Sequence, residues 1–355
     1  MKAMIAMSGG VDSSVAALLM QKEGYTCIGA SMRLLPGQEM SSVQKVAERL
    51  GIPFVCPDMQ STFEEHVIRP FIEEYLAGRT PNPCIVCNET MKFGKLDEER
   101  RRLGCDVLVT GHYVRITCED GVYHLKKAKD PKKDQSYMLY RLSQQTLSHV
   151  RFPLGEYTKA EVREMAMDAG FENASQAESQ DICFVPEGDY SEVLRLFLNR
   201  PGEKSKYEAL YPHATDSGDF VDRDGKVLGR HNGRICYTIG QRKGLGISAT
   251  HPLYVLGMDA ENNRVILGKN EDLFQSKLTA SNVCWIAGEP PKAGARVQAR
   301  IRYHGEDATA TVVFAEGIGG KLALVFEKPQ RAITPGQSVV LYDGDDVLGG
   351  GIISV

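Results

Sequence analysis

Two cysteines three residues apart, Cys84 and Cys87 in the segment PNPCIVCN, form the first motif that could do chemistry. A structural disulfide, a metal site, a redox pair and a sulfur-handling nucleophile all start from such a pair. A thioredoxin-like pair is disfavoured, because that pair opens a helix after a strand and has no proline immediately before its first cysteine. Zinc is disfavoured because the chain has no second CxxC, and His112 could complete a site only if the fold brought it close.

A second motif, SGGVDSS from Ser8 to Ser14, indicates a phosphate-binding loop. Its two glycines let the backbone approach an anion closely, and free amides at the start of a following helix would point at that anion. Ser8 and Ser13 add hydroxyl donors. Asp12 beside a phosphate implies a magnesium ion between them. The motif lacks the lysine of the GxxxxGK[ST] loop, so it need not hold the terminal phosphates of a nucleotide in that way.

The elements that position these motifs follow from the hydrophobic pattern. Over residues 1 to about 110, short apolar runs alternate with amphipathic stretches, which predicts right-handed βαβ units and a parallel sheet. The predicted strands cover residues 3–7, 26–34, 52–58 and 105–113. The predicted helices cover residues 14–24, 41–51, 158–170 and 190–200. The phosphate loop then lies between the first strand and the first helix.

The composition and the hydrophobic pattern change after residue 200, where Gly, Asp and short strand-like segments dominate. We therefore predict an α/β N-terminal domain over residues 1–200 and a small β-rich central domain over 201–275. From residue 276 to 355, alternating strands separated by Gly and Pro turns predict a C-terminal antiparallel β-barrel. Helical periodicity is not expected to return after residue 200.

Composition limits the class of protein. The chain has 355 residues, 42% of them hydrophobic and 25% charged, with a net charge of -4, which predicts a soluble globular protein of two or three domains. No apolar run approaches the length of about 18 residues needed to cross a membrane. The N-terminus has no signal-peptide pattern, so we expect a cytoplasmic location. The nine scattered cysteines should then be mostly thiols.

Several segments in collinear order resemble the tRNA-specific 2-thiouridylases, which belong to the PP-loop ATP pyrophosphatases. The segments are SGGVDSS, GRTPNPCIVCN (78–88), TGHY (110–113), KDQSYMLY (133–140), ESQDICF (178–184), GRHNGRICYTIGQRKGLGI (229–247), IRY (301–303) and ITPGQSVVLYDGD (333–345). The resemblance implies that ATP adenylates the 2-carbonyl of the wobble uridine in tRNA, commonly the tRNAs for Lys, Glu and Gln. Sulfur then displaces AMP and leaves 2-thiouridine.

The same resemblance implies the site residues. ATP would be bound by Ala6, Met7, Ser8, Gly9, Gly10, Val11, Asp12, Ser13, Met32 and Gly111. The tRNA would be bound by Asn82, His112, Lys133, Asp134, Gln135, Arg302, Tyr303 and Gln337. The target base must leave its stack to reach the adenylating centre.

The resemblance leaves the sulfur chemistry with two alternatives. In the usual account Cys183 carries a persulfide, and Cys87 attacks it or forms a disulfide with Cys183 after transfer. Many members of the family have Asp where this chain has Cys84. Three thiolates at Cys84, Cys87 and Cys183 could instead hold a [4Fe–4S] cluster with one open iron that binds hydrosulfide. A desulfurase with carrier proteins, or free sulfide, could each be the sulfur donor.

One further feature bears on RNA. In the strand ARVQARIRY, Arg296, Arg300 and Arg302 share a predicted solvent face and could contact phosphates.

Two other classes of function are weighed: a PP-loop ligase that acts on a small molecule, and a non-enzymatic RNA-binding or iron–sulfur carrier protein. The first would need neither three site cysteines nor an arginine-faced barrel, and the second would not need SGGVDSS.

Overall fold

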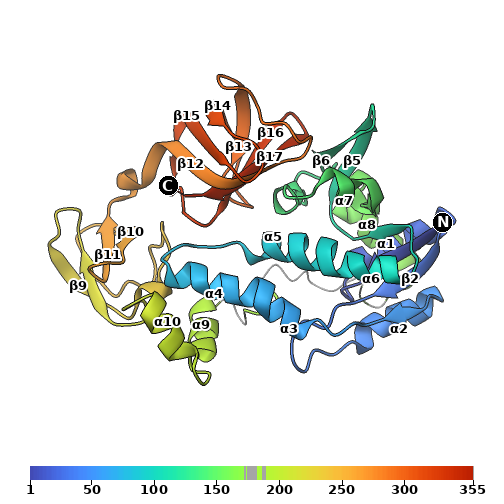
Figure 1. The fold of residues 1–355 in the computed structure, drawn as a ribbon, viewed down its shortest axis with the longest axis horizontal. Helices are drawn as coiled ribbons and strands as arrows, with labels where there is room; N and C mark the ends of the chain where they lie inside the picture. The colour runs from blue at the N-terminus through green and yellow to red at the C-terminus, as the bar shows by residue number, and fades with distance from the viewer. Residues whose placement is uncertain (172, 174–181, 186–188, 355) are drawn as a thin grey trace.

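The N-terminal part of the chain is built on a parallel five-stranded sheet (Figure 1). The computed structural model describes residues 1–354 except 172, 174–181 and 186–188. The strand order is β3-β2-β1-β4-β7 and every pairing is parallel, as the alternation of strands and helices predicts. The bounds are β1 Lys2–Ala6, β2 Thr26–Ala30, β3 Phe54–Val55, β4 Val107–Val109 and β7 Val150–Arg151.

Helices cover this sheet and continue beyond it. Within the described residues they are α1 Val11–Lys22, α2 Ser41–Leu50, α3 Gln60–Phe63, α4 Arg69–Leu76, α5 Pro83–Cys87, α6 Leu96–Arg102, α7 Gln144–His149, α8 Lys159–Asp168, α9 Tyr190–Leu198 and α10 Glu203–Leu210. Short 3-10 turns cover Ser136–Met138 and Pro153–Glu156. The expectation that helix would not return after residue 200 is wrong at α10, whose buried side is essentially Tyr207 alone, a signal too weak to read from sequence. None of the described helices is long and apolar enough to cross a membrane.

Two of the helical segments contain a π-helical middle. The π-helix η1 (Glu64–Ile68) joins α3 to α4, and η2 (Asn88–Lys95) joins α5 to α6. Helix α5 begins at Pro83, where a missing N–H costs nothing, and the side chain of Asn82 accepts a hydrogen bond from the Cys84 N–H at 3.2 Å. The CxxC pair therefore occupies the first turns of a helix that widens directly after it, and π-segments of this kind are frequent at functional sites.

The middle of the chain forms a small separate sheet of order β10-β11-β8-β9. Its elements are β8 Gly218–Val221, β9 Val227–His231, the 3-10 turn η7 Arg234–Cys236, β10 Tyr254–Asp259 and β11 Arg264–Gly268, and a further 3-10 turn η8 (Asn270–Leu273) leads out of it. Phe220, Val255 and Leu267 are buried between these elements.

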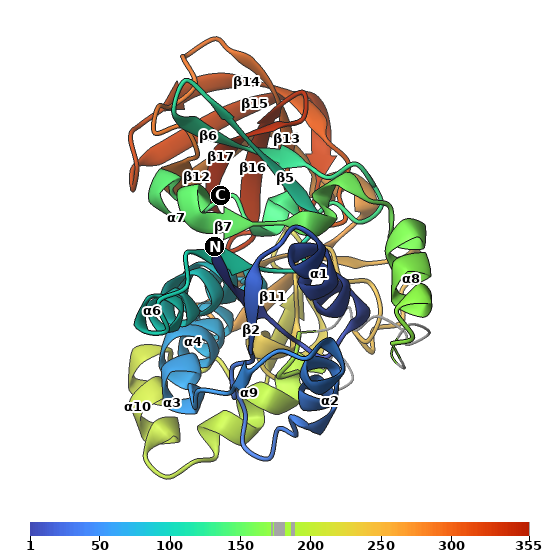
Figure 2. The same ribbon diagram turned by 90° about the vertical axis from the view of Figure 1, so that its right-hand side faces the viewer.

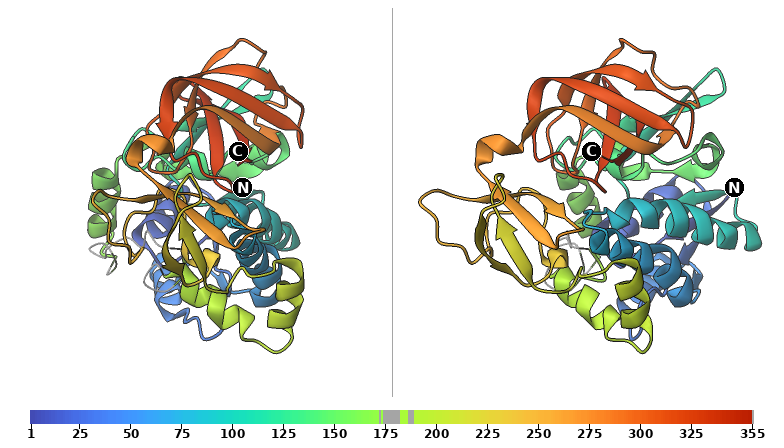
Figure 3. Two further views of the ribbon diagram at one scale, coloured as in Figure 1. Left: turned by 90° about the vertical axis from the view of Figure 1, so that its left-hand side faces the viewer. Right: turned by 60° about the vertical axis from the view of Figure 1, so that its left-hand side comes forward.

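The C-terminal strands close into a six-stranded antiparallel barrel, seen at the top of both views in Figure 3. The six strands follow one another in the order β12-β15-β14-β13-β16-β17. The barrel closes because β12, the first of them, pairs with β15 on one side and with β17, the last, on the other. The strands are β12 Phe274–Trp285, β13 Arg296–Arg300, β14 Ala308–Ala315, β15 Lys321–Arg331, β16 Ser338–Asp343 and β17 Asp346–Ile353.

One hairpin of the N-terminal region joins the barrel rather than the parallel sheet. It consists of β5 (Val114–Glu119) and β6 (Val122–Lys127), and β6 pairs with β17 through Lys126 and Asp346. Figure 2 shows both strands beside the barrel, above the parallel sheet. Nothing in the local pattern of residues 114–127 indicates this, because the pairing partner lies more than 200 residues away and a strand pattern does not name its neighbour.

A buried charge network fastens the hairpin region to the barrel. The Arg300 guanidinium contacts Asp307 at 2.6 Å and Asp134 at 3.1 Å, and Lys127 contacts Asp307 at 2.7 Å. The side chains of Arg300 and Asp134 are only 13% and 3% exposed. These groups are therefore withdrawn from water and depend on one another for compensation.

Arg300→Ala should destabilise the protein by about 3–5 kcal/mol, because it leaves two buried carboxylates facing only one cation. The shift of the urea unfolding transition measures this. Arg296→Ala is the matched control: its pairing with Glu327 is at 2.8 Å but the Arg296 side chain is 70% exposed, so it should cost about 1 kcal/mol or less. Equal effects of the two variants would contradict the buried network.

Candidate active site

The SGGVDSS loop connects β1 to α1, and Gly10 is the N-cap of that helix. The Ser8 N–H donates to Ser13 Oγ at 3.2 Å, while the hydroxyls of Ser13 and Ser14 donate to the Gly10 carbonyl at 3.1 and 3.0 Å. The Ser13 hydroxyl, expected to donate to phosphate, thus shapes the loop. Ser8 is exposed, and the free amides at the start of α1 remain available to an anion.

Two close backbone approaches fix the shape of this loop. A Cβ on Gly111, in the turn after β4, would lie 2.8 Å from the Asp12 carbonyl carbon and 2.9 Å from the Ser13 nitrogen. Gly9 has a φ of +81° and packs against Ser42 at the start of α2. Gly111 therefore lies against the phosphate loop, although 97 or more residues separate them in sequence, and its part in ATP binding stays a prediction.

The Asp12 side chain is held by residues that no sequence pattern identifies. Lys159 Nζ lies 2.8 and 2.9 Å from the two Asp12 carboxylate oxygens, and the Tyr113 hydroxyl donates to Oδ1 at 2.7 Å. The Lys159 side chain is 10% exposed, so the pair is largely withdrawn from solvent. This lysine supplies, from α8, a cation beside a loop whose own motif has none.

Asn173 closes over the same loop from the other side. Its buried side-chain amide donates to the Gly9 carbonyl at 2.7 Å and to Ser14 Oγ at 3.3 Å. Its Oδ1 atom is buried without a hydrogen-bond partner among the described residues. An unpaired buried acceptor next to a phosphate loop is a position where a ligand or water donor would be favourable.

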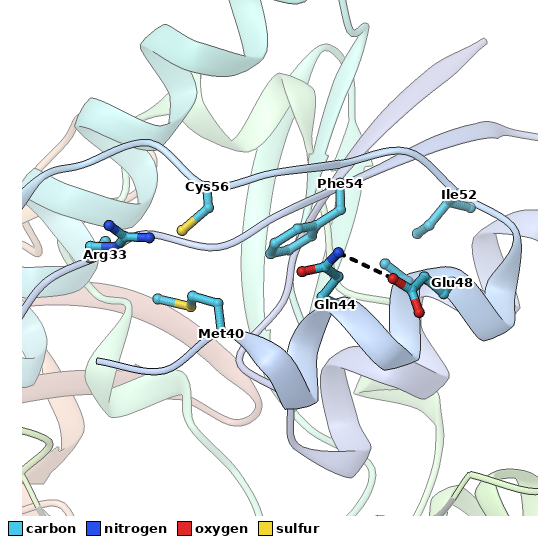
Figure 4. Close-up of a pocket in the computed structure, with 8 residues that line it drawn as sticks. Arg33, Met40, Gln44, Glu48, Ile52, Phe54 and Cys56 are labelled. Carbon is cyan, nitrogen blue, oxygen red and sulfur yellow. Dashed lines mark hydrogen bonds between the residues drawn. The ribbon is translucent and has the colours of Figure 1, made fainter. Parts of the chain in front are cut away.

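The other predicted ATP residues lie at the carboxyl ends of β1 and β2. Ala6 ends β1 and Met7 is buried, whereas Met32 is half-buried and packs between two apolar clusters. A cavity of about 410 Å³ lies beyond them, between α2 and β3 (Figure 4). Arg33, Met40 and Cys56 line one end of it, and Gln44 donates to Glu48 at 3.2 Å across its wall. None of the predicted ATP residues lines this cavity.

The fold brings together the three cysteines that the sequence singles out. Cys84 and Cys87 are half-buried on α5, and Cys183 is exposed. Burial raises the pKa of the Cys87 and Cys183 thiols, and neighbouring thiols raise each pKa further: Cys183 and Cys84 act on Cys87, and Cys84 acts on Cys183. All nine cysteines are free, so the disulfide between Cys87 and Cys183 that the persulfide mechanism would form is not present in this state.

The anchor that holds Cys183 here is its neighbour Phe184. That ring makes edge contacts with Phe63 and Phe71, at centroid distances of 5.7 and 5.1 Å, and Cys87 packs against the same apolar cluster. The first residues of the motif ESQDICF, numbers 178–181, lie outside the described residues.

Lys92 is a candidate that sequence reasoning missed. It lies five residues after Cys87 on η2, a spacing that brings two side chains to one face of a π-helix. Burial raises the pKa of Cys87 to about 11 and also raises the pKa of Cys84 and Cys183, and Lys92 opposes the shift in all three. Lys92 Nζ lies 3.5 Å from His112 Nε2, and its positive charge acts on all three thiols.

Alkylation of Cys87 by iodoacetamide in the tRNA-free protein should accelerate about tenfold for each pH unit between 7 and 10. The reason is that only the thiolate reacts, and a pKa of about 11 keeps the thiol protonated throughout that range. Lys92→Met should slow the reaction at pH 8 about fivefold, because the pKa rises further without the cation. Fragmentation mass spectrometry that assigns the label to Cys87 rather than Cys84 measures both rates. A plateau below pH 9 would contradict the assignment.

The three thiols do not form a site for a single metal ion. Among the described residues, which include all three cysteines, no group of three or more His, Cys, Asp or Glu side chains is placed to hold a metal ion, so His112 does not complete a zinc site with them. The cysteines of a [4Fe–4S] cluster each bind a different iron and stand further apart than the ligands of one ion, so the cluster on Cys84, Cys87 and Cys183 stays a prediction.

His112, expected near tRNA, is buried at the edge of this cluster. Its Nδ1 lies 2.7 Å from the Thr110 hydroxyl and its Nε2 lies 3.5 Å from Lys92 Nζ. Burial, and secondarily Lys92, hold its pKa well below the usual value, so the imidazole is neutral near pH 7. His112 is consequently an uncharged polar side chain that lies beside Lys92.

The other residues expected at tRNA differ in how they are placed. Asp134 is buried, and its carboxylate accepts from Ser136 at 2.8 Å in addition to its contact with Arg300. Gln135 accepts from the Tyr113 N–H at 2.9 Å, while Lys133 is half-buried. Tyr303 is half-buried too, next to Tyr137.

The predicted solvent face shared by three arginines on ARVQARIRY is wrong, whereas contact of these residues with tRNA stays a prediction. The strand β13 ends at Arg300, which is engaged with Asp134 and Asp307, and the guanidinium of Arg302 donates to the carbonyls of Arg331 and Ala332. Only Arg296 of the three keeps an exposed side chain. Alternation along a strand gives the face of each residue correctly but cannot reveal a carboxylate that arrives from another segment.

Comparison with known proteins covers the whole chain. The family models described as tRNA methyl transferase HUP domain, tRNA methyl transferase PRC-barrel domain and Aminomethyltransferase beta-barrel domain match residues 1–187, 210–269 and 275–353. The tRNA-specific 2-thiouridylase MnmA of Clostridioides difficile is 43% identical over 368 residues, covering 99% of this chain and 98% of that protein. The MnmA of Geobacter metallireducens is 43% identical and covers 98% and 95%.

Among solved structures the likeness is weaker. A U34-tRNA thiolase NcsA from Methanococcus maripaludis with its [4Fe-4S] cluster is 20% identical, with a TM-score of 0.35, and covers 60% of this chain and 72% of that chain. A 4-thiouridine synthetase in complex with RNA and ATP is 18% identical, with a TM-score of 0.36, and covers 59% and 53%. At these scores the likeness supports no inference about this chain.

Proposed function

The chain belongs to the tRNA-specific 2-thiouridylase family, and from that premise we propose how its residues divide the reaction. The protein is a PP-loop enzyme that uses ATP to convert a uridine of tRNA into 2-thiouridine. The descriptions of the matching family models speak of methyl transfer, but the relatives that match over their full length are thiouridylases.

We place adenylation at the phosphate loop. The uridine O2 attacks the α-phosphorus of ATP, the bond to the β-phosphate oxygen breaks, and pyrophosphate leaves, so that the base carries an AMP group on O2. The amides of the SGGVDSS loop would hold the phosphates, with Ser8 exposed to donate and Gly111 shaping the loop from behind. Mg²⁺ would sit chiefly on the phosphates, because Lys159 already contacts both oxygens of Asp12.

We place sulfur transfer at Cys183 and Cys87. A persulfide on Cys183 attacks C2 of the adenylated base and AMP leaves, which joins the base to Cys183 through two sulfurs. The Cys87 thiolate then attacks the Cys183 sulfur, so the S–S bond to the base breaks and 2-thiouridine leaves. The resulting Cys87–Cys183 disulfide needs an external dithiol to reduce it before the next cycle.

The observation that carries this proposal is the contrast between the two cysteines. Cys183 is exposed, where a sulfur donor can reach it, and Cys87 is half-buried within its electrostatic range. We assign no step to a [4Fe–4S] cluster, because the persulfide path needs only these two cysteines. The cluster on Cys84, Cys87 and Cys183 is the alternative that the iron assay below tests. Nothing in the structure explains why Cys84 stands where many relatives have Asp.

The partners follow from the same proposal. The substrate tRNAs would be those for Lys, Glu and Gln, with the wobble uridine turned out of its stack beside Asn82 and Cys84. Lys133, Gln135 and Tyr303 would lie along the tRNA. The sulfur donor would be a desulfurase whose carriers deliver sulfane sulfur to Cys183. Free sulfide could serve only by attacking Cys183 in the Cys87–Cys183 disulfide, which breaks that S–S bond and leaves a Cys183 persulfide and a Cys87 thiol.

Anaerobic purification followed by assays of iron, acid-labile sulfide and visible absorption tests the sulfur path, with Cys84→Asp alongside. We expect an iron-free protein and thiolation by Cys84→Asp within about tenfold of the parent, because neither Cys183 nor Cys87 is altered. About four irons per chain, lost in Cys84→Asp, would overturn the persulfide path. Release of AMP and pyrophosphate without tRNA would instead favour a ligase that acts on a small molecule.

A further inference from the structure

A tight turn of the barrel touches the segment that leads into the cysteine helix. Its four residues are Thr334, Pro335, Gly336 and Gln337, and the Gln337 N–H donates to the Thr334 carbonyl at 3.2 Å. Pro at the second position and Gly at the third, with a φ of +90° at Gly336, are the pattern of a type II turn. Strand β17 fixes the turn, because the Ile353 N–H donates to the Gln337 carbonyl at 2.7 Å.

This turn grips the chain directly before α5. The Thr80 N–H donates to the Pro335 carbonyl at 2.9 Å, and Gln337 Nε2 donates back to the Thr80 carbonyl at 2.8 Å and to the Pro81 carbonyl at 3.4 Å. The approach is so close that a Cβ on Gly336 would lie 2.9 Å from the Thr80 nitrogen. Three residues further on, α5 begins at Pro83.

A second path ties the same helix to the same turn. Asn82 Nδ2 contacts Met138 Sδ at 3.5 Å, and Asn88 Nδ2 donates to the Met138 carbonyl at 3.1 Å, so Met138 touches α5 at both ends. The neighbouring Tyr137 hydroxyl donates to the carbonyl of Ser338, the residue after Gln337, at 2.8 Å. Cys84 and Cys87 lie between these anchors.

We propose that Gln337 is a positioning residue, through which the β-barrel sets the place of the Cys84–Cys87 helix relative to the parallel sheet. The Gln337 side-chain amide already donates a hydrogen bond to the Thr80 carbonyl in the protein without tRNA. A tRNA that docks on the barrel would thereby act on the cysteine helix through the turn. The inference rests on the proposed role of Cys87 in sulfur transfer, but the contact itself can be tested without that role.

The test compares Gln337→Ala with the parent in hydrogen exchange, tRNA affinity and single-turnover thiolation. Without tRNA, the amides of residues 79–88 should exchange about 5–10-fold faster, because the Thr80 carbonyl loses its partner and the Thr80–Pro335 bond is weakened. The thiolation rate at saturating tRNA should fall about tenfold, with tRNA affinity changed by less than about threefold. Gln337→Lys, which keeps a donor of similar reach, should recover most of the slow exchange, whereas Gln337→Glu should not.

Gln330→Ala is the matched control, since Gln330 lies on the same barrel and its side chain donates to Lys328. It should leave all three measurements unchanged. Unaltered exchange in Gln337→Ala, with weaker tRNA binding, would overturn the proposal and make Gln337 a tRNA contact only. Faster exchange with no loss of thiolation would also overturn it. A failure of the proposed sulfur path would give a different result. Cys87→Ala would then thiolate tRNA at the parent rate, while Gln337→Ala would still show the faster hydrogen exchange.

Discussion

Replacing Cys183 with alanine should reduce 2-thiouridine formation by about 10³-fold or more, with pyrophosphate release in the first turnover kept within a few-fold of the parent. The reason is that the proposal puts adenylation at the loop between β1 and α1, where it needs no thiol, and puts the incoming sulfur on the exposed cysteine. Mass spectrometry of digested tRNA measures the product, and rapid quench measures pyrophosphate.

Cys118→Ala is the control for that experiment, because Cys118 is also exposed but lies on β5, on the hairpin that joins the barrel. Its thiolation should match the parent. If Cys183→Ala still thiolated tRNA with free sulfide as donor, the sulfur path proposed above would fail, and sulfide would have to reach the adenylated base without a carrier on this chain.

Gly111→Ala should lower the rate of adenylation about 100-fold. The added methyl group would lie 2.8 Å from the Asp12 carbonyl carbon and 2.9 Å from the Ser13 nitrogen, both of them backbone atoms that cannot turn aside. The phosphate loop must shift, and a displacement of about 1 Å at a reacting group costs about two orders of magnitude in rate. ATP–pyrophosphate exchange in the presence of tRNA measures this.

Gly257→Ala provides the comparison. Gly257 lies on β10, its added methyl would meet nothing within 4 Å, and exchange should proceed at the parent rate. Thermal unfolding of both variants separates a displaced loop from a destabilised protein. A Gly111→Ala enzyme that adenylates normally would show that the loop accommodates the methyl group, and Gly111 would lose its assigned role.

The sequence is a good guide to the N-terminal sheet, and the reason is local. The strands β1 and β2 are nearly continuous apolar runs, since both faces of such a sheet are buried, and each is followed by a helix. The strand β7 has only two residues, too few to give such a signal, and the sequence does not predict it. The phosphate loop is found for the same reason, because its glycines and serines are contiguous. The convergence of Cys183 with Cys87 came instead from family resemblance, which carries long-range information that a period cannot.

What the sequence could not predict depends on partners that arrive from far along the chain. Lys159 reaches Asp12 from α8, and Asp134 removes Arg300 from the solvent face on which alternation placed it. Such contacts do not alter the hydrophobic periodicity of the sequence, because the residue type is the same whether a charged side chain faces water or a buried counter-charge. Lys92 is different: its spacing from Cys87 was readable, once the π-helical turn between them is known.

The turn of Thr334 to Gln337 has a consequence for biosynthesis. A chain made from its N-terminus can fold the parallel sheet early, but Thr80 receives its partners only after residues 335 and 337, more than 250 residues further along the chain, have left the ribosome. The hairpin of β5 and β6 likewise waits for β17. A nascent or prematurely terminated chain would therefore carry a formed nucleotide loop beside an unfixed cysteine helix. Formation of the sulfur site would depend on prior synthesis of the barrel.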